Sequence, residues 1–309
     1  MTGLRHSSYD IAIIGAGPAG LTAGMYSARQ GLATVIIAAE VGGQAAWADK
    51  IENYIGWDVI SGRELIARFR EHVRQFDVDC LEGQLVNAIA PAEDGFDLYT
   101  REGESLHARA VIIATGRSIN RLAVPGEAEL LGRGVSYCAT CDGAFFRGQP
   151  VAVVGSTESA ADAALELANL DATVTLVSPS AMKAPEAVLA KVHASPAITV
   201  RTGVKVLAIE GESRVTGLAI RDNVTQAEES IPVNGVFIET GSIPASEYTG
   251  GIVEMNARGE IIVDKSCATN VPGIYAAGDV TDGSGKQIII AAGEGARASM
   301  AASKDLKRR

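Results

Sequence analysis

Short apolar runs alternate along this chain with glycine turns and with stretches that have the length of a helix. Residues 9–40 contain the apolar run YDIAIIGAG, the small-residue stretch LTAGMYSARQG and the apolar run ATVIIAAE. Such runs are typical of buried strands, so the pattern predicts a strand–turn–helix–strand unit. Residues 149–178, QPVAVVGSTESAADAALELANLDATVTLVS, repeat this pattern.

Other segments extend this repeated pattern. Residues 61–76 predict an amphipathic helix. Its apolar positions are Leu65, Ile66, Phe69, Val73 and Phe76. Strand-like segments end in ARAVIIATG at residues 108–116, and a third apolar stretch, GIYAAGDV, occupies residues 273–280.

The repetition predicts an α/β fold of two Rossmann-like, FAD/NAD(P)-binding domains in a three-layer ββα architecture, with the second domain inserted into the first. The chain is expected to cross between them at TGRSIN (115–120) and TGSIPA (240–245), which are rich in Gly, Ser and Pro. The outer domain is predicted to comprise residues 1–117 and 244–309, and the inserted domain residues 118–243.

The first turn carries the pattern G-x-G-x-x-G at Gly15, Gly17 and Gly20. In a strand–turn–helix context these glycines allow a tight turn, close approach of a pyrophosphate, and close packing of helix on strand. The helix start adds free N–H groups and a partial positive charge. The outer domain is therefore predicted to bind a dinucleotide.

The composition of the chain limits which partners we expect it to bind and in which compartment we expect it. The 309 residues carry a formal net charge of −10, which argues against general nucleic-acid binding. No apolar run approaches the roughly 20 residues that cross a bilayer, and no apolar signal segment precedes the first strand. We expect a soluble, cytoplasmic protein without a membrane partner, in a compartment that normally keeps thiols reduced.

Two of the four cysteines form a C-x-x-C pair, Cys138 and Cys141. Such a pair can close a disulfide and reopen it by thiolate exchange. Asp142 follows directly, where a carboxylic acid can deliver protons. Half a zinc site is the alternative, but it needs two more ligands close by, and the histidines are scattered. We therefore expect a redox pair and no metal.

These motifs together resemble the low-molecular-weight thioredoxin reductases, which are FAD flavoproteins. The resemblance covers nearly the whole chain and rests on an ordered set of segments. They are GAGPAG (15–20), GGQ (42–44), ENYIG (52–56), ATG (114–116), CATCDG (138–143), YAAGD (275–279) and KQIIIAAGEGA (286–296). The resemblance implies a homodimer, FAD in the outer domain, a redox disulfide in the inserted domain, and thioredoxin as a partner.

The resemblance also assigns site residues. Cys141 would face the flavin, Cys138 would attack the partner disulfide, and Asp142 would serve as the proton donor. The implied FAD-binding residues are Gly15, Gly17, Pro18, Ala19, Gly20, Glu40, Gly43, Gln44, Asn53, Val86, Thr115, Gly116, Gly278, Asp279, Lys286, Gln287 and Ile288. Among these, Glu40 falls near the end of the second strand, where an acidic residue usually binds the adenosine ribose.

The glycine loop of the inserted domain is degenerate. Relatives that use NADPH carry G-x-G-x-x-A there, and a His-Arg-Arg run after the next strand clamps the 2′-phosphate. Here Thr157 takes the second glycine position, and Ser178-Pro179-Ser180 replaces the clamp. Losing two or three charged hydrogen bonds of about 1.5–3 kcal/mol each would weaken NADPH binding roughly 10²- to 10⁶-fold.

We therefore expect another electron donor, ferredoxin or a similar one-electron carrier, as in the ferredoxin-dependent branch of the family. Four alternatives stay open at this point. They are an NADPH site rebuilt from other residues, a second flavin, a dithiol oxidase that passes electrons to oxygen, and a redox sensor without enzymatic activity.

An acidic ferredoxin would need a basic docking surface on this acidic chain. One candidate is the C-terminal run KDLKRR (304–309), which could equally be a solvated tail. Another is the set Arg117, Arg121, Arg133 and Arg147, near the domain crossing and the C-x-x-C pair.

Overall fold

The computed structural model describes residues 6–308, so the first five residues and Arg309, the last residue of KDLKRR, lie outside the described residues. The chain forms two compact units. The first unit comprises the chain up to Trp47, Tyr54–Ser118, and the chain from Ile243 onwards. The second unit comprises Ala48–Asn53 and Ile119–Ser242.

The first unit is built on a seven-stranded sheet in the order β3-β2-β1-β6-β5-β4, with β17 also paired to β6. Strands β1, β2, β3, β6 and β17 pair in parallel, whereas β4 and β5 join through antiparallel pairing. The strands are β1 (Tyr9–Ala16), β2 (Thr34–Val41), β3 (Val78–Glu82), β4 (Val86–Ala92), β5 (Gly95–Thr100), β6 (Ser105–Ile113) and β17 (Ile274–Ala276).

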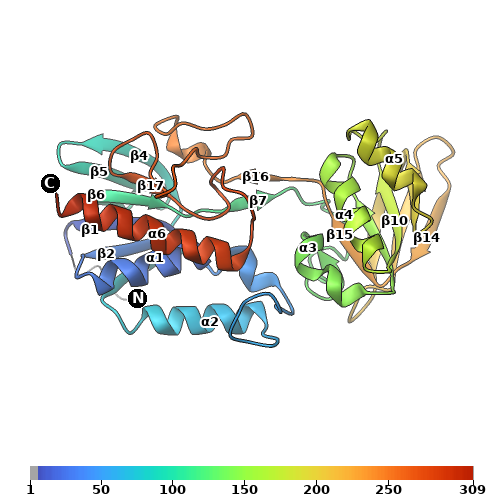
Figure 1. Ribbon diagram of the computed structural model, residues 1–309, viewed down its shortest axis with the longest axis horizontal. Coiled ribbons are helices and arrows are strands. Elements are labelled where there is room, and N and C mark those ends of the chain that lie inside the picture. The colour runs from blue at the N-terminus through green and yellow to red at the C-terminus, as the bar shows by residue number, and fades with distance from the viewer. Residues whose placement is uncertain (1–5, 309) are drawn as a thin grey trace. The chain divides into compact units, whose positions relative to one another are not determined.

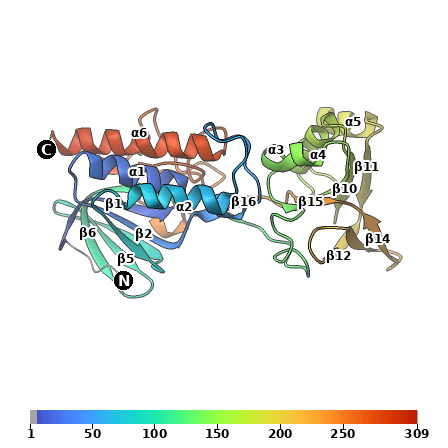
Figure 2. The ribbon, with the colours of Figure 1, turned by 90° about the horizontal axis from the view of Figure 1, so that it is seen from below.

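Three helices cover one face of this sheet (Figures 1 and 2): α1 (Pro18–Arg29), α2 (Gly62–Val73) and α6 (Ile288–Leu306). Small residues let α1 and α6 pack closely. A Cβ on Gly295 would lie 2.1 Å from the Ala19 carbonyl oxygen, so only glycine fits there. The buried Ser27 and Ser299 hydroxyls hydrogen-bond at 2.8 Å across the same contact.

Helix α2 is the amphipathic helix expected at residues 61–76, but it is shorter than expected. Ser61 caps its start, because the Ser61 hydroxyl accepts the Glu64 N–H at 3.2 Å. The helix ends at Val73, and Phe76 belongs to the turn that follows, where its N–H donates to the Val73 carbonyl at 3.0 Å. The apolar spacing alone could not show where the turn begins.

The second unit has three layers. Its central parallel sheet has the order β11-β10-β9-β15-β8, with α4 and α5 packed on one face. An antiparallel sheet, β12-β13-β14, packs on the other face. The parallel strands are β8 (Val135–Ser136), β9 (Pro150–Val154), β10 (Thr173–Ser178), β11 (Ile198–Thr202) and β15 (Gly235–Ile238). The other elements are α3 (Ala139–Asp142), α4 (Glu158–Asn169), α5 (Glu186–Ala194), β12 (Val204–Glu210), β13 (Gly217–Asp222) and β14 (Glu228–Pro232).

The chain passes between the units through β7 (Arg117–Ile119) and β16 (Ser242–Pro244), which pair with each other. Three short 3₁₀ helices complete the structure: η1 (Gly43–Trp47), η2 (Gly143–Phe146) and η3 (Glu247–Thr249). The chain is therefore an α/β protein in which a second Rossmann-like unit interrupts the first, as expected. Within residues 6–308, no helix combines the length and the apolar character that a membrane crossing requires.

Candidate active site

The glycine loop of the first unit joins β1 to α1. Gly15 has a φ of +108°, and a Cβ there would lie 2.3 Å from the Ala114 carbonyl oxygen. A Cβ on Gly20 would lie 1.8 Å from the Gly15 carbonyl oxygen. Gly17 differs, because a Cβ there would meet nothing within 4 Å. Gly15 and Gly20 thus keep the turn tight, while Gly17 borders open space at the start of α1, which fits a pyrophosphate.

Several expected FAD-binding residues follow the carboxyl ends of parallel strands in this sheet. Glu40 lies near the end of β2, Thr115 and Gly116 follow β6, and Gly278 and Asp279 follow β17. Because parallel strands end at a common edge, these residues lie on the same edge as the glycine loop. Burial raises the pKa of the Asp279 carboxyl.

Hydrogen bonds hold the chain segments that lie next to these expected FAD-binding residues. The Thr115 hydroxyl donates to the Ala245 carbonyl at 2.7 Å, and the Gln44 amide donates to the Arg117 carbonyl at 2.7 Å. The Lys286 ammonium donates to the Thr281 carbonyl at 2.6 Å, shortly before Gln287, the N-cap residue of α6.

Two expected FAD-binding residues lie elsewhere. Asn53 groups with the second unit. Val86 begins β4, where its side chain is buried in the apolar core. Their roles stay predictions.

The structure adds two features that sequence patterns did not indicate. Arg117 forms a largely buried ion pair with Glu260, with 2.8 Å between Nη1 and Oε1, so its charge is not free for docking. The Tyr248 hydroxyl is buried and has no hydrogen-bond partner among residues 6–308. It lies three residues after Ala245, which accepts the Thr115 bond, and a bound cofactor could satisfy it.

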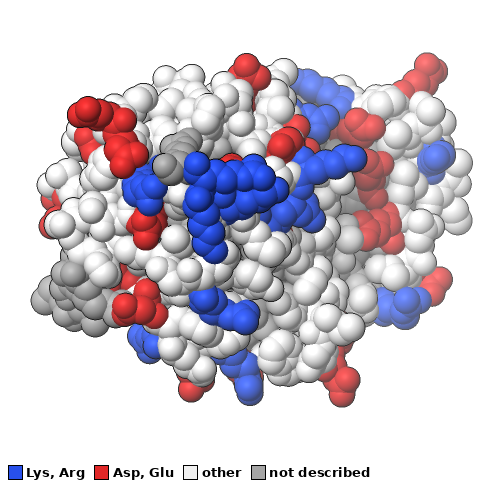
Figure 3. Space-filling model, turned by 60° about the vertical axis from the view of Figure 1, so that its left-hand side comes forward, with Lys and Arg blue, Asp and Glu red and all other residues white. Residues whose placement is uncertain are grey.

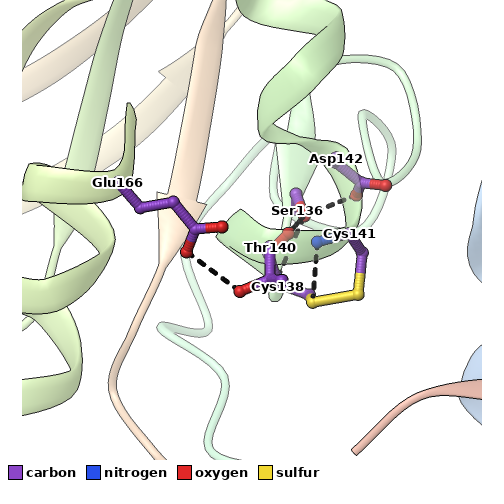
Figure 4. Close-up of a disulfide and its surroundings, with 6 residues drawn as sticks. All are labelled: Ser136, Cys138, Thr140, Cys141, Asp142 and Glu166. Carbon is purple, nitrogen blue, oxygen red and sulfur yellow. Dashed lines mark hydrogen bonds between the residues drawn. A yellow bond between two sulfur atoms is a disulfide. The ribbon is translucent and has the colours of Figure 1, made fainter. Parts of the chain in front are cut away.

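The C-x-x-C pair in the second unit is a disulfide, with 2.08 Å between the sulfur atoms (Figure 4). Cys138 is the N-cap residue of α3, and its Sγ accepts the Cys141 N–H at 3.1 Å. Both cysteines are half-buried. Within residues 6–308, no group of His, Cys, Asp and Glu side chains could hold a metal ion.

Asp142 lies at the end of α3 beside the disulfide (Figure 4). Burial raises the pKa of its carboxyl, although the Ser136 hydroxyl, 2.6 Å from Oδ2, partly opposes this effect. Asp142 also lines a cavity of about 330 Å³. A carboxyl with a raised pKa and access to a cavity can hold a proton and deliver it to a thiolate.

The degenerate loop of the second unit lies between β9 and α4. The Lys183 N–H donates to the Ser156 carbonyl at 2.6 Å, so the segment after β10 folds back onto the loop. The Ser159 hydroxyl donates to the Glu239 carboxylate at 2.6 Å. The Ser178 hydroxyl, where the family's clamp would begin, donates to the Ser180 carbonyl at 2.7 Å.

These residues do not fit a nicotinamide nucleotide. Thr157 is the N-cap residue of α4 and stands where the NADPH-using relatives have their second glycine. The segment after β10 offers Ser178 and Ser180 in place of a cationic clamp. The loop therefore lacks both the second glycine and the arginine clamp of those relatives.

Comparisons with known proteins identify the family. The family model "Pyridine nucleotide-disulphide oxidoreductase" matches residues 9–295. The F component of the alkyl hydroperoxide reductase of Pseudomonas putida is 41% identical over 299 residues, which cover 96% of this chain. The match covers 58% of that relative, so the chain spans less than two thirds of its length.

Comparison with solved structures indicates the same family. A thioredoxin reductase from Streptococcus pyogenes has a TM-score of 0.94 at 36% identity, covering 98% of this chain and 99% of that one. A thioredoxin reductase from Giardia duodenalis has a TM-score of 0.91 at 29% identity, covering 98% and 100%. The chain therefore belongs to the pyridine nucleotide-disulphide oxidoreductase family, resembles its low-molecular-weight thioredoxin reductases, and has FAD as its cofactor.

Proposed function

We propose that the protein is a FAD-dependent thioredoxin reductase that takes electrons from ferredoxin or a similar one-electron carrier rather than from NADPH. The observation that carries the choice of donor is the degenerate loop, where Thr157 takes the second glycine position and Ser178-Pro179-Ser180 replaces the cationic clamp. The Cys138–Cys141 disulfide and the half-buried Asp142 support the reductase activity. A homodimer and a cytoplasmic location stay predictions.

The reduction potentials of ferredoxin and thioredoxin allow ferredoxin to act as the electron donor. A low-potential ferredoxin lies near −400 mV and thioredoxin near −270 mV. The difference of about 130 mV over two electrons releases about 6 kcal/mol. When bound, FAD accepts electrons singly or in pairs, so it can connect a one-electron carrier to a disulfide.

The chain's own residues perform the thiol exchange. Two electrons and two protons convert the Cys138–Cys141 disulfide into a dithiol. The Cys138 thiolate then attacks one sulfur of the partner disulfide, which forms a mixed disulfide and releases a partner thiolate. The Cys141 thiolate attacks Cys138 Sγ, re-forms the internal disulfide and releases the second partner thiolate. We infer that Asp142, the residue next to Cys141, exchanges protons with these thiolates.

The C-terminal run KDLKRR is a poor docking surface for an electron donor. Helix α6 starts at the edge of the sheet that carries the cofactor residues, and its 19 residues span about 28 Å. Lys304 and Lys307 lie at its other end, next to the last turn of α1, because Ser303 hydrogen-bonds Gln30 at 2.5 Å. Cations gather on the face seen in Figure 3, where the end of α6 comes forward. Cations at the C-terminal end of a helix also interact favourably with the helix dipole.

Arg133 remains a more suitable docking candidate than Arg117. Its side chain is exposed and lines the same cavity as Asp142, together with Arg214. Arg147 lies 3.7 Å from Asp171, so an exposed carboxylate already screens its charge.

The deciding experiment is anaerobic reduction of the oxidised holoenzyme. Reduced ferredoxin should bleach the FAD absorbance near 450 nm rapidly, and added salt should slow this step. Millimolar NADPH or NADH should bleach it at least 100-fold more slowly. Bleaching by NADPH within seconds would contradict the proposed donor. Rapid oxygen uptake with a small dithiol, without ferredoxin-driven thioredoxin reduction, would indicate a dithiol oxidase instead.

Asp142→Asn should slow thioredoxin reduction by about 10²-fold or more, the usual size of general acid–base catalysis. The variant should also be more stable than the wild type at pH 8. Burial holds the pKa of Asp142 above its unfolded value of about 3.9, so the folded protein binds more protons between the two pKa values. The stability of the wild type therefore falls as pH rises through that window. The variant has a neutral amide at this position, so its stability does not fall in this way.

Turnover assays and thermal unfolding at pH 4 and pH 8 test both effects. The stability gain should shrink toward pH 4, because the unfolded wild-type carboxyl, with a pKa of about 3.9, is then itself about half protonated. Unchanged turnover across this pH range would show that Asp142 is not the proton donor.

A further inference from the structure

Glu239 lies between the degenerate loop and the redox helix. In the parallel sheet of the second unit, β15 lies between β9 and β8. The degenerate loop follows β9, helix α3 with its disulfide follows β8, and Glu239 directly follows β15. The Glu239 N–H continues the pairing with β9, because it donates to the Val154 carbonyl at 2.8 Å. The strand order therefore brings all three features to the carboxyl edge of one sheet.

Carboxylates contact both residues between the two cysteines. The Ala139 backbone lies near the Glu239 carboxyl and lowers its pKa, and this carboxylate also accepts the Ser159 hydroxyl at 2.6 Å. The Thr140 hydroxyl donates to Glu166 Oε2 at 2.9 Å (Figure 4). Glu239 is half-buried, and burial raises the pKa of its carboxyl, with a smaller contribution from the Glu166 charge. Asp142 lies at the other end of this short helix.

We propose that Glu239, with Glu166, is a positioning residue that fixes α3 and makes the Cys138–Cys141 dithiol a stronger reductant. The inference rests on the proposed role of this pair as the redox centre. In this arrangement the former nucleotide loop no longer binds a phosphate and instead holds the helix that carries the disulfide.

The direction of the effect follows from charge. An N–H at the start of a helix normally stabilises the thiolate of a preceding cysteine. Here Cys138 Sγ accepts the Cys141 N–H, but Glu239 adds a negative charge next to Ala139, the residue that directly follows Cys138. This charge disfavours the Cys138 thiolate and so disfavours the reduced form where that thiolate is populated. A less stable reduced form transfers its electrons to a partner disulfide more favourably.

Glu239→Gln keeps the size of the side chain and removes its charge. A nearby charge shifts a thiol pKa by about one unit, so at pH 8.5 we expect about a fivefold shift toward the dithiol in exchange with dithiothreitol. A fivefold shift corresponds to about 20 mV for a two-electron couple. At pH 7 in the Cys141→Ser background, Cys138 should react about threefold faster with iodoacetamide. Lowering the pKa of Cys138 by about one unit produces about tenfold more thiolate at pH 7. Each thiolate is less nucleophilic at the lower pKa, so the net increase in rate is only about threefold.

The exchange is measured on the holoenzyme under anaerobic conditions by labelling thiols with a maleimide. It needs neither thioredoxin nor an electron donor, so its outcome is independent of the proposed function. The matched control is Asp162→Asn, which removes an exposed carboxylate from the same helix as Glu166. Glu166→Gln should shift the equilibrium in the same direction as Glu239→Gln, and it serves as the readout if Glu239→Gln does not fold.

Two results would overturn the proposal. One is an exchange equilibrium in both Gln variants that matches Asp162→Asn. The other is a shift toward the disulfide in place of the dithiol.

Discussion

Replacing either Cys138 or Cys141 by Ser is expected to reduce thioredoxin reduction to the background rate while FAD stays bound. Each cysteine is half of the disulfide, so neither variant can complete a two-electron exchange. Apart from Asn53, the residues expected to bind FAD belong to the first unit, and the cysteines belong to the second. Absorbance near 450 nm should therefore persist, and a coupled thioredoxin assay with reduced ferredoxin should report the loss of turnover.

The same variants separate the roles of the two cysteines. Cys141→Ser should trap a stable mixed disulfide between Cys138 and thioredoxin, because no second thiol remains to resolve it. Cys80→Ser is the matched control and should keep full activity, since burial raises the pKa of the Cys80 thiol and makes it a weak nucleophile. A trapped complex with Cys138→Ser instead would reverse the assigned roles.

The sequence predicted most of the fold because its signals are local. Gly15 and Gly20 of the first loop lie where a side chain would collide with the Ala114 or Gly15 carbonyl, so these two positions of the motif indicate the turn. The apolar runs that predicted strands are buried in the two sheets. The C-x-x-C spacing likewise forces two thiols close together, and the structure joins them.

The contacts that define the site's electrostatics could not be predicted in this way. Arg117 and Glu260 are 143 residues apart, and Ser159 and Glu239 are 80 residues apart. Ser159 and Glu239 meet because β9 and β15 are neighbouring strands, whereas Glu260 reaches Arg117 from the irregular segment between η3 and β17. No local pattern distinguishes Glu239 from an ordinary exposed acidic residue, because its contacts depend on β15 lying between β8 and β9.

The position of the basic C-terminal run could not be predicted for a similar reason, and its role in docking stays a prediction. The sequence shows the charges of KDLKRR but not the direction of the helix that carries them. Because α6 starts beside the cofactor residues, its length places Lys304 and Lys307 at the far end of the first unit. These lysines therefore lie about 28 Å from the start of the helix.

Gly17→Ala is expected to weaken FAD binding by at least about 100-fold without harming the fold. Gly17 has an ordinary extended conformation, with φ −76° and ψ −174°, and a Cβ there meets no atom of the chain within 4 Å. The new methyl group would instead occupy the space that the pyrophosphate needs. Losing two charge-assisted hydrogen bonds of about 1.5–3 kcal/mol each gives a loss of about 10²-fold or more.

The apoprotein should be as stable as the wild-type apoprotein or slightly more stable, because Ala in a compatible conformation gains about 0.4–1 kcal/mol over Gly. Gly20→Ala is the contrasting variant, since its Cβ would lie 1.8 Å from the Gly15 carbonyl oxygen and must displace the backbone. It should lose both FAD and thermal stability. Fluorescence titration with FAD and thermal unfolding of the apoproteins measure the two properties separately. If Gly17→Ala retains stoichiometric FAD with unchanged affinity, the space beside Gly17 does not hold the pyrophosphate, and the assignment of this loop fails.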